Sequence, residues 1–155
     1  MEAQHEGVVD EWRSDPGARE RLRRRLAHSG GFFEGRLDLG IEVDGELAGT
    51  LDARRPAAAL PPGVYELGIV LFASGSRGRG YGTEAVRLLT GHLFRELGAE
   101  RVQASTDVAN GAMRRVLERL GFVEEGVMRG FMPAEDGRSD YVLYGVTRSE
   151  WEARD

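Results

Sequence analysis

The sequence has no cysteine among its 155 residues, no long hydrophobic run and no excess of positive charge. The absence of cysteine excludes a disulfide framework, a thiolate metal site and a cysteine nucleophile. No apolar stretch approaches the length of a membrane span, and the first residues lack the apolar core of a signal peptide. We therefore expect a cytoplasmic protein without membrane contact. The net charge of −5 argues against a general nucleic-acid binder and favours cationic partners such as amines.

The composition, 41% hydrophobic and 30% charged, is that of a globular chain long enough for one domain with its own core. Residues 1–30 are polar and predict a helical N-terminal segment, interrupted at Pro16. The arginine-rich stretch 19–26 could contact RNA, but a solvated helix face with Leu22 and Leu26 turned inward is favoured. His5 and His28 have no metal-ligand spacing around them, so no metal site is expected.

The stretch from residue 66 to 83 predicts a strand, a glycine loop and a helix in succession. Its first half is apolar and predicts a strand buried on both faces, over Leu67, Ile69, Val70, Leu71 and Phe72. Glycines follow at every second position in Arg77-Gly78-Arg79-Gly80-Tyr81-Gly82, and helical periodicity begins at Thr83. A helix start offers unpaired N–H groups and the positive end of the dipole, and glycines let an anion approach them. This stretch is therefore a candidate phosphate site.

The remaining elements predict a mixed sheet flanked by helices. Residues 37–43 and 46–52 alternate around Asp44-Gly45, which predicts a hairpin. Further strands are expected at 102–106, 122–128 and 141–146, and a helix at 110–120. Helices alternating with strands in the middle imply parallel pairing there, and hairpins at each end imply antiparallel pairing. The expected fold class is α/β, or mixed α+β, in a single domain 1–155.

Three separated motifs resemble one protein family. The loop lacks the Gly-Lys-Ser/Thr ending of a P-loop and the third glycine of a dinucleotide fingerprint, but Arg77-x-x-Gly80-x-Gly82 resembles the acetyl-CoA pyrophosphate loop of the GNAT N-acetyltransferases. The segment from Asn110 to Gly121-Phe122 resembles the family's Asn-initiated helix. The tail, from Glu125-Gly126 to Glu150-Trp151, is similar to the ribosomal-protein-alanine N-acetyltransferase-like branch. The resemblance covers roughly residues 35–152, and nothing before it resembles the branch's usual first strand.

The resemblance implies that acetyl-CoA is the co-substrate and that no metal takes part. The backbone of Val70, Leu71 and Phe72 would bind the pantetheine arm and the acetyl carbonyl like an added strand. The pyrophosphate would be held by Arg77, Gly78, Arg79, Gly80, Tyr81, Gly82 and Thr83. Asn110 would contact the pantetheine arm, which is compatible with a helix N-cap because the cap uses only the side-chain oxygen.

Acetyl transfer requires a neutral amine, a donor for the oxyanion and a leaving thiol. Glu66 is the acidic residue nearest the expected chemistry and is the candidate general base, acting through water. The alternative is an ordinary exposed carboxylate at a strand end, and Asp107 or a water held by backbone carbonyls is then the next candidate base. The family's usual general acids are replaced by Met113 and Leu117, which leaves Tyr144, Tyr141 or water to protonate the thiolate.

The expected function is N-acetyl transfer to a primary amine, either a protein N-terminus or a small molecule, by direct attack in a ternary complex. A non-catalytic acyl-CoA-binding or regulatory domain is the alternative, and an RNA-associated protein is a third class. The missing first strand would leave an open sheet edge for the N-terminal helices or for another subunit, as in a homodimer, to cover.

Overall fold

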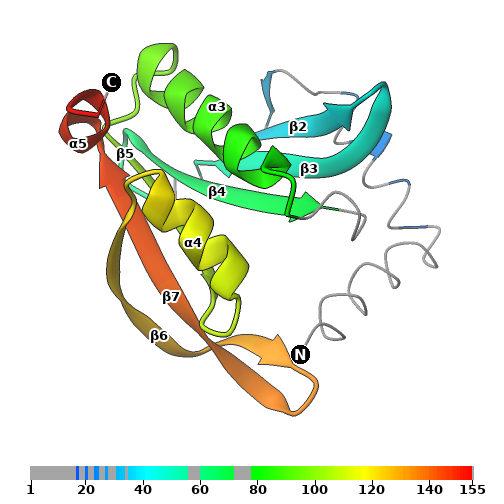
Figure 1. Ribbon diagram of the computed structural model, residues 1–155, viewed down its shortest axis with the longest axis vertical. Coiled ribbons are helices and arrows are strands. Elements are labelled where there is room, and N and C mark those ends of the chain that lie inside the picture. The colour runs from blue at the N-terminus through cyan, green and yellow to red at the C-terminus, as the bar shows by residue number, and fades with distance from the viewer. Residues whose placement is uncertain are drawn as a thin grey trace.

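Seven strands form one mixed sheet in the order β1-β2-β3-β4-β5-β7-β6 (Figure 1). The computed structural model describes residues 17, 20, 23, 24, 27, 31–33, 35–55, 60–71 and 78–154. The elements are β1 (Phe32–Phe33), β2 (Arg36–Val43), β3 (Glu46–Arg54), β4 (Val64–Leu71), α3 (Tyr81–Arg95), β5 (Arg101–Asp107), α4 (Gly111–Arg119), β6 (Val123–Ala134), β7 (Gly137–Thr147) and α5 (Arg148–Glu152). The pairing of β4 with β5 is parallel and every other pairing is antiparallel, which confirms the expected mixed sheet.

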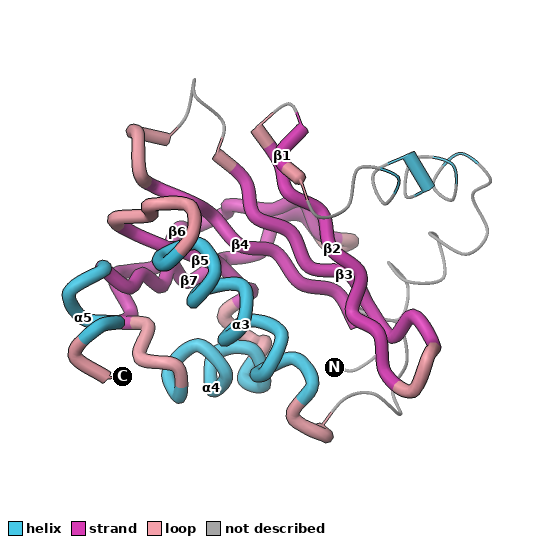
Figure 2. Tube along the Cα trace, turned by 90° about the horizontal axis from the view of Figure 1, so that it is seen from above, coloured by secondary structure: helices cyan, strands magenta, loops and turns pink. Residues whose placement is uncertain are grey.

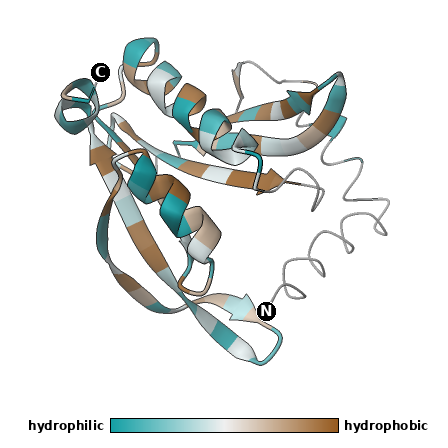
Figure 3. Ribbon diagram, in the orientation of Figure 1, coloured by the Kyte–Doolittle hydropathy of each residue, from teal (hydrophilic) through white to brown (hydrophobic). Residues whose placement is uncertain are grey.

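The helices α3, α4 and α5 cover one face of the sheet (Figure 2). Hydrophobic residues lie along β4 and β7 and on the sides of α3 and α4 that meet the sheet (Figure 3). The largest fully buried side chains include Phe94 of α3, Leu117 of α4 and Tyr144 of β7. Trp151 of α5 is 8% exposed and stacks on Phe94 with ring centroids 5.8 Å apart. Burial of each large apolar side chain contributes roughly 1.5–3 kcal/mol, so this layer supplies most of the stability.

We call the opposite side of the sheet the polar face, because its strand positions carry charged and amide side chains. They are Arg36 and Asp38 of β2, Asp52 and Arg54 of β3, Glu66 of β4, and Arg101 and Gln103 of β5. The sheet register places these residues side by side on neighbouring strands, since Arg54 pairs with Glu66 and Glu66 pairs with Gln103.

The hairpin and the two long helices agree with the sequence. Asp44 and Gly45 have φ of 52° and 81°, the left-handed conformation that a two-residue hairpin turn requires.

Five residues between 17 and 27 are helical and exposed, and Arg24 pairs with Glu20 across one turn at 3.4 Å. This supports the solvated helix face for that part of the arginine stretch. Leu22, Leu26 and the first sixteen residues lie outside the described residues.

Several boundaries differ from the expectation. The central strand is not buried on both faces, because Val70 lies on the polar face and is 47% exposed. The first long helix begins at Tyr81, two residues before Thr83, because Gly80 already serves as its N-cap. Strands β6 and β7 are longer than expected and continue through irregular pairing between Met128 and Met132. This irregularity interrupts the alternation from which the sequence prediction was made.

Two elements were not predicted. β1 is too short to show a pattern. Helix α5 does have a signal in the sequence, because the side chain of Thr147 caps Glu150 N–H while the Glu150 carboxylate accepts from Thr147 N–H. Ser/Thr-x-x-Glu is the capping-box pattern of a helix start.

Candidate active site

The strands β4 and β5 are paired only along the first part of their length. The register runs from Val64 opposite Arg101 to Leu67 opposite Ala104, while β4 continues to Leu71 and β5 to Asp107. On its other side β4 stays paired with β3 as far as Leu71. One backbone edge of β4 beyond Leu67 is therefore not paired with β5, and an extended ligand could bind there as an added strand.

Helix α3 begins beside this unpaired edge. A Cβ on Gly82 would lie 3.6 Å from Leu71 Cδ1 and 3.8 Å from Ile69 Cδ1, so the first turn of α3 packs directly on β4. Gly78 and Gly80 have φ of 75° and 85°, and none of the described residues other than their chain neighbours lies within 4 Å of a Cβ built on either. Gly80 is the N-cap and has no side chain with which to occupy the helix N–H groups. The loop end thus has the backbone conformation and the free space that an anion site needs.

Six of the seven predicted loop residues, 78–83, are placed around this helix start, whereas Arg77 and the strand residue Phe72 are not. Arg79 is exposed, whereas Tyr81 and Thr83 are half-buried in the first turn of α3. Phe72 and Arg77 lie outside the described residues. Their assigned contacts with the pantetheine arm and the pyrophosphate remain predictions.

Helix α4 begins at the end of β5. Asn110 is its N-cap, and the side-chain Oδ1 accepts from Met113 N–H at 3.1 Å. The cap uses the amide oxygen, so the NH2 group of Asn110 can donate to a ligand. The starts of both long helices therefore lie where their strands end, next to the point at which β4 and β5 separate (Figure 1).

Glu66 lies one residue before that point, on the polar face. It is the third residue of β4 and its side chain is 30% exposed, so it is neither at the start of the strand nor an ordinary exposed carboxylate. Its Oε1 forms an ion pair with Arg54 Nη2 at 3.2 Å. Its Oε2 accepts a hydrogen bond from Gln103 Nε2 at 3.0 Å. Sequence reasoning did not identify Arg54 and Gln103, although both are polar positions of alternating strands.

Tyr144 cannot serve as an accessible general acid in this arrangement. It is 0% exposed and lies on the helix-covered face, beneath α4. Its hydroxyl donates to Glu118 Oε1 at 2.9 Å and accepts from Arg114 Nε at 3.1 Å. Burial is the largest cause that raises the pKa of Tyr144 above its ordinary value. These contacts fasten α4 to β7 and assign Tyr144 a structural role.

Tyr141 remains open as the proton donor. It is half-buried and pairs with Asp107 across β5 and β7. Burial, followed by the negative charge of Asp107, raises the pKa of Tyr141. The Asp107 carboxylate accepts from Ala109 N–H at 2.8 Å, which braces the turn into α4. Met113 is half-buried and Leu117 is buried, so both pack in the interior as their apolar character predicts.

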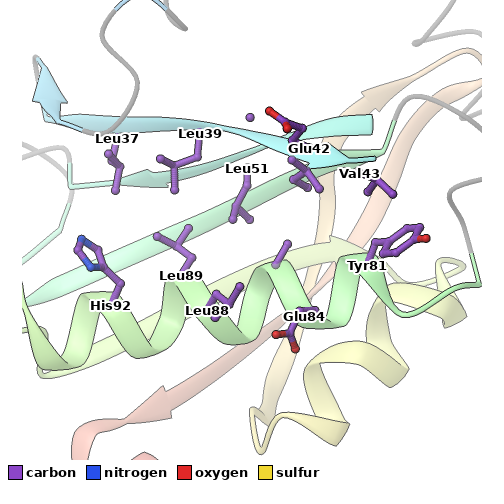
Figure 4. Close-up of a pocket in the computed structure, with 13 residues that line it drawn as sticks. Leu37, Leu39, Glu42, Val43, Leu51, Tyr81, Glu84, Leu88, Leu89 and His92 are labelled. Atoms are coloured by element: carbon purple, nitrogen blue, oxygen red, sulfur yellow. The ribbon is translucent and has the colours of Figure 1, made fainter. Parts of the chain in front are cut away.

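A groove of about 500 Å³ lies between β2 and α3. Leu37, Leu39 and Leu51 face Leu88 and Leu89 across it (Figure 4). The groove is apolar and lies on the β2 side of α3, whereas the separation of β4 and β5 lies on the side of α4 (Figure 1). Its polar lining residues are Glu42, Tyr81, Glu84 and His92, and none of its lining residues belongs to β4 or β5, so acetyl transfer is not assigned to it.

The described residues contain neither a metal-binding cluster nor a membrane-spanning helix. No group of three or more histidine, aspartate or glutamate side chains in this part of the chain is arranged to hold a metal ion. None of the described helices combines the length and the apolar character needed to cross a membrane.

Comparison with known proteins agrees with the geometry of the strands and loop. Residues 2–123 match the family described as acetyltransferase (GNAT) domain. The chain belongs to the GNAT acetyltransferase family. The match begins well before residue 35, where the resemblance recognised in the motifs begins.

Individual relatives and neighbours are consistent with this membership. The chain is 32% identical over 116 residues to "Putative ribosomal N-acetyltransferase YdaF" of Bacillus subtilis, covering 75% of this chain and 62% of that protein. It therefore spans less than two thirds of this relative. RimJ of Mycobacterium smegmatis, solved in complex with CoA-disulfide, has a TM-score of 0.71 at 26% identity, with 87% of this chain and 61% of that chain covered.

A further neighbour is similar in fold alone. The ribosomal-protein-S5-alanine acetyltransferase from Vibrio fischeri has a TM-score of 0.68 at 22% identity, and the alignment covers 85% of this chain and 69% of that chain. These comparisons confirm the family and the fold class that the three motifs predicted. They do not test the individual site residues, which stay predictions.

Proposed function

We propose that this protein transfers the acetyl group of acetyl-CoA to a primary amine. The observation that carries the proposal is the separation of β4 from β5 beside the glycine-capped start of α3. An unpaired strand edge suits the amide groups of a pantetheine arm, and a helix start with open glycines suits a pyrophosphate. A GNAT relative in complex with CoA-disulfide supports the same ligand.

The residues divide between holding the co-substrate and serving the reaction. Val70, Leu71 and Phe72 would offer backbone groups to the pantetheine arm, and residues 77–83 would hold the pyrophosphate. The NH2 group of Asn110 would donate to the pantetheine arm from the start of α4. A backbone N–H of the unpaired β4 edge would stabilise the oxyanion.

Glu66 would act from the polar face. The amine nitrogen forms a bond to the acetyl carbon, the carbon–sulfur bond breaks, and one proton leaves the nitrogen. Glu66 would take that proton through a water molecule, since its oxygens keep acceptor positions besides the ion pair with Arg54 and the hydrogen bond from Gln103. The departing thiolate would gain a proton from Tyr141 or water, and its ordinary pKa lets it leave without a strong acid.

The acceptor is proposed to be a peptide N-terminus or a small amine. The net charge of −5 suits a cationic acceptor. The relative described as "Putative ribosomal N-acetyltransferase YdaF" favours the peptide.

The test combines binding and turnover. Calorimetry with acetyl-CoA should show binding, and a ligand at 100 times its Kd should add roughly 2.7 kcal/mol to the free energy of unfolding. A thiol-detection assay across amines and N-terminal peptides should show CoA release, and mass spectrometry should find the acetylated product. No binding at millimolar acetyl-CoA would contradict the proposal. Binding without product on any amine would favour the non-catalytic acyl-CoA-binding domain instead.

A further inference from the structure

A continuous row of polar contacts crosses the polar face from β2 to β6, and we call it the charge ladder. Its members are Arg36, Asp38, Asp52, Arg54, Glu66, Gln103, Arg101 and Glu125. Along the row, Asp52 pairs with Arg36 at 3.1 Å and with Arg54 at 3.2 Å. At the far end, Arg101 binds Glu125 at 2.7 Å. The proposed base, Glu66, lies in the interior of this row.

The two neighbours of Glu66 hold its carboxylate from opposite sides. Arg54 reaches Oε1 from β3, and Gln103 reaches Oε2 from β5. Rotation of the carboxylate would lengthen the ion pair with Arg54 or break the hydrogen bond from Gln103, so the two neighbours together restrain its orientation. An ionised carboxylate has about four acceptor positions, which leaves room for a water molecule or the incoming amine.

The neighbours are themselves held in place. Gln103 Oε1 accepts from Arg101 Nε at 3.1 Å, which directs the Nε2 group towards Glu66. Asp52, which pairs with Arg54, lies over Gly68, where a Cβ would come within 2.7 Å of its Oδ1. A residue larger than glycine at position 68 would displace this carboxylate. Support for Glu66 is thus built into the neighbouring strands.

We propose that Arg54 and Gln103 are positioning residues that orient Glu66 for acetyl transfer. This inference rests on the proposed function, because orientation matters only if Glu66 takes part in the reaction. Small displacements of a reacting group have large effects on rate, so loss of either neighbour should lower kcat by up to roughly a hundredfold. The KM for acetyl-CoA should stay unchanged, because neither side chain is assigned to the co-substrate.

The experiment measures kcat and KM for three single variants of the full chain, Arg54→Met, Gln103→Met and Glu66→Gln. It also includes the double variant that combines Arg54→Met with Glu66→Gln. If Arg54 acts through Glu66, Arg54→Met lowers kcat in the wild-type background and has little further effect in the Glu66→Gln background. Arg54→Lys keeps a positive charge and should restore part of the rate.

Arg36→Met is the matched control. Arg36 is an arginine of the same ladder with similar exposure, 33% against 40% for Arg54, but it contacts Asp38 and Asp52 and not Glu66. Because Arg36 reaches Glu66 only through Asp52 and Arg54, Arg36→Met should lower kcat much less than Arg54→Met does. Circular dichroism and melting curves establish that each variant is folded, and Gln103→Met tests the same idea should Arg54→Met fail to fold.

The outcomes separate the two proposals. Acetyl transfer by the wild type, together with loss of the Arg54→Met effect in the Glu66→Gln background, supports the positioning role. An effect that persists in full in that background, or an equal loss in Arg36→Met, overturns the positioning role and leaves the proposed function intact. Absence of transfer by the wild type to every amine tested overturns both.

Discussion

Replacing Gly80 by glutamate places a negative charge where the pyrophosphate is proposed to bind. Gly80 is the N-cap of α3, has a φ of 85°, and has open space around its missing Cβ. A side chain therefore fits, and its cost to the fold is the strain of a left-handed non-glycine residue, about 1–2 kcal/mol. Most domains have 5–15 kcal/mol of stability, so the variant should remain folded.

The effect on binding follows from Coulomb's law. Two unit charges about 4 Å apart repel each other by about 1 kcal/mol in water and about 4 kcal/mol at the effective dielectric constant of a protein surface. The Kd for acetyl-CoA should therefore rise by roughly fivefold to a thousandfold. Repulsion between exposed charges is screened by salt, so the increase should shrink between 0.1 M and 1 M salt, where the Debye length falls from roughly 10 to 3 Å.

Two control variants isolate the charge. Gly80→Gln has the same size and the same backbone strain without the charge, so it should bind acetyl-CoA better than Gly80→Glu. Gly98→Glu adds a carboxylate at another glycine with positive φ, 67°, and open space, beyond the opposite end of α3. It should lose similar stability and keep its affinity. Isothermal calorimetry gives the three Kd values, and equal affinities for Gly80→Glu and Gly80→Gln would place the pyrophosphate elsewhere.

Three further predictions concern stability and are measured by denaturant and thermal unfolding. Thr147→Ala removes the capping box of α5 and should cost about 0.5–2 kcal/mol, whereas no change would show that the cap does not stabilise the helix. Leu117→Ala, at a residue with 0% exposure, should cost about 2–5 kcal/mol, and a cost below about 1 kcal/mol would contradict its place in the core. The hydrogen bonds from Arg101 lower the pKa of Glu125 below 4.5. The stability that Glu125 adds is thus present above pH 4.5 and is lost as the pH falls through the lowered pKa. Glu125→Gln should therefore have a lower free energy of unfolding than wild type at pH 7, and the two values should converge in acid; a difference that does not depend on pH would contradict this.

The sequence by itself determined the elements that depend on neighbouring residues. Asp44-Gly45 specifies a tight hairpin because glycine readily adopts a positive φ and aspartate tolerates it. Gly80 ends the loop for the same reason, and Asn110 caps α4 through a contact only three residues away. The order of the predicted elements was enough to predict the mixed sheet, and the resemblance of three motifs predicted the family.

Only the tertiary structure decided which side chains meet. The contact between Gln103 and Glu66 joins residues 37 positions apart, and it exists because β4 and β5 pair in one particular register. The same register shows where the two strands separate, which no local pattern indicates. The sequence alone made Tyr144 and Tyr141 equal candidates for the general acid. In the structure, the packing of α4 on β7 buries the Tyr144 hydroxyl against Glu118. Long-range pairing sets such contacts, because a shift of one residue would turn each side chain to the other face of the sheet.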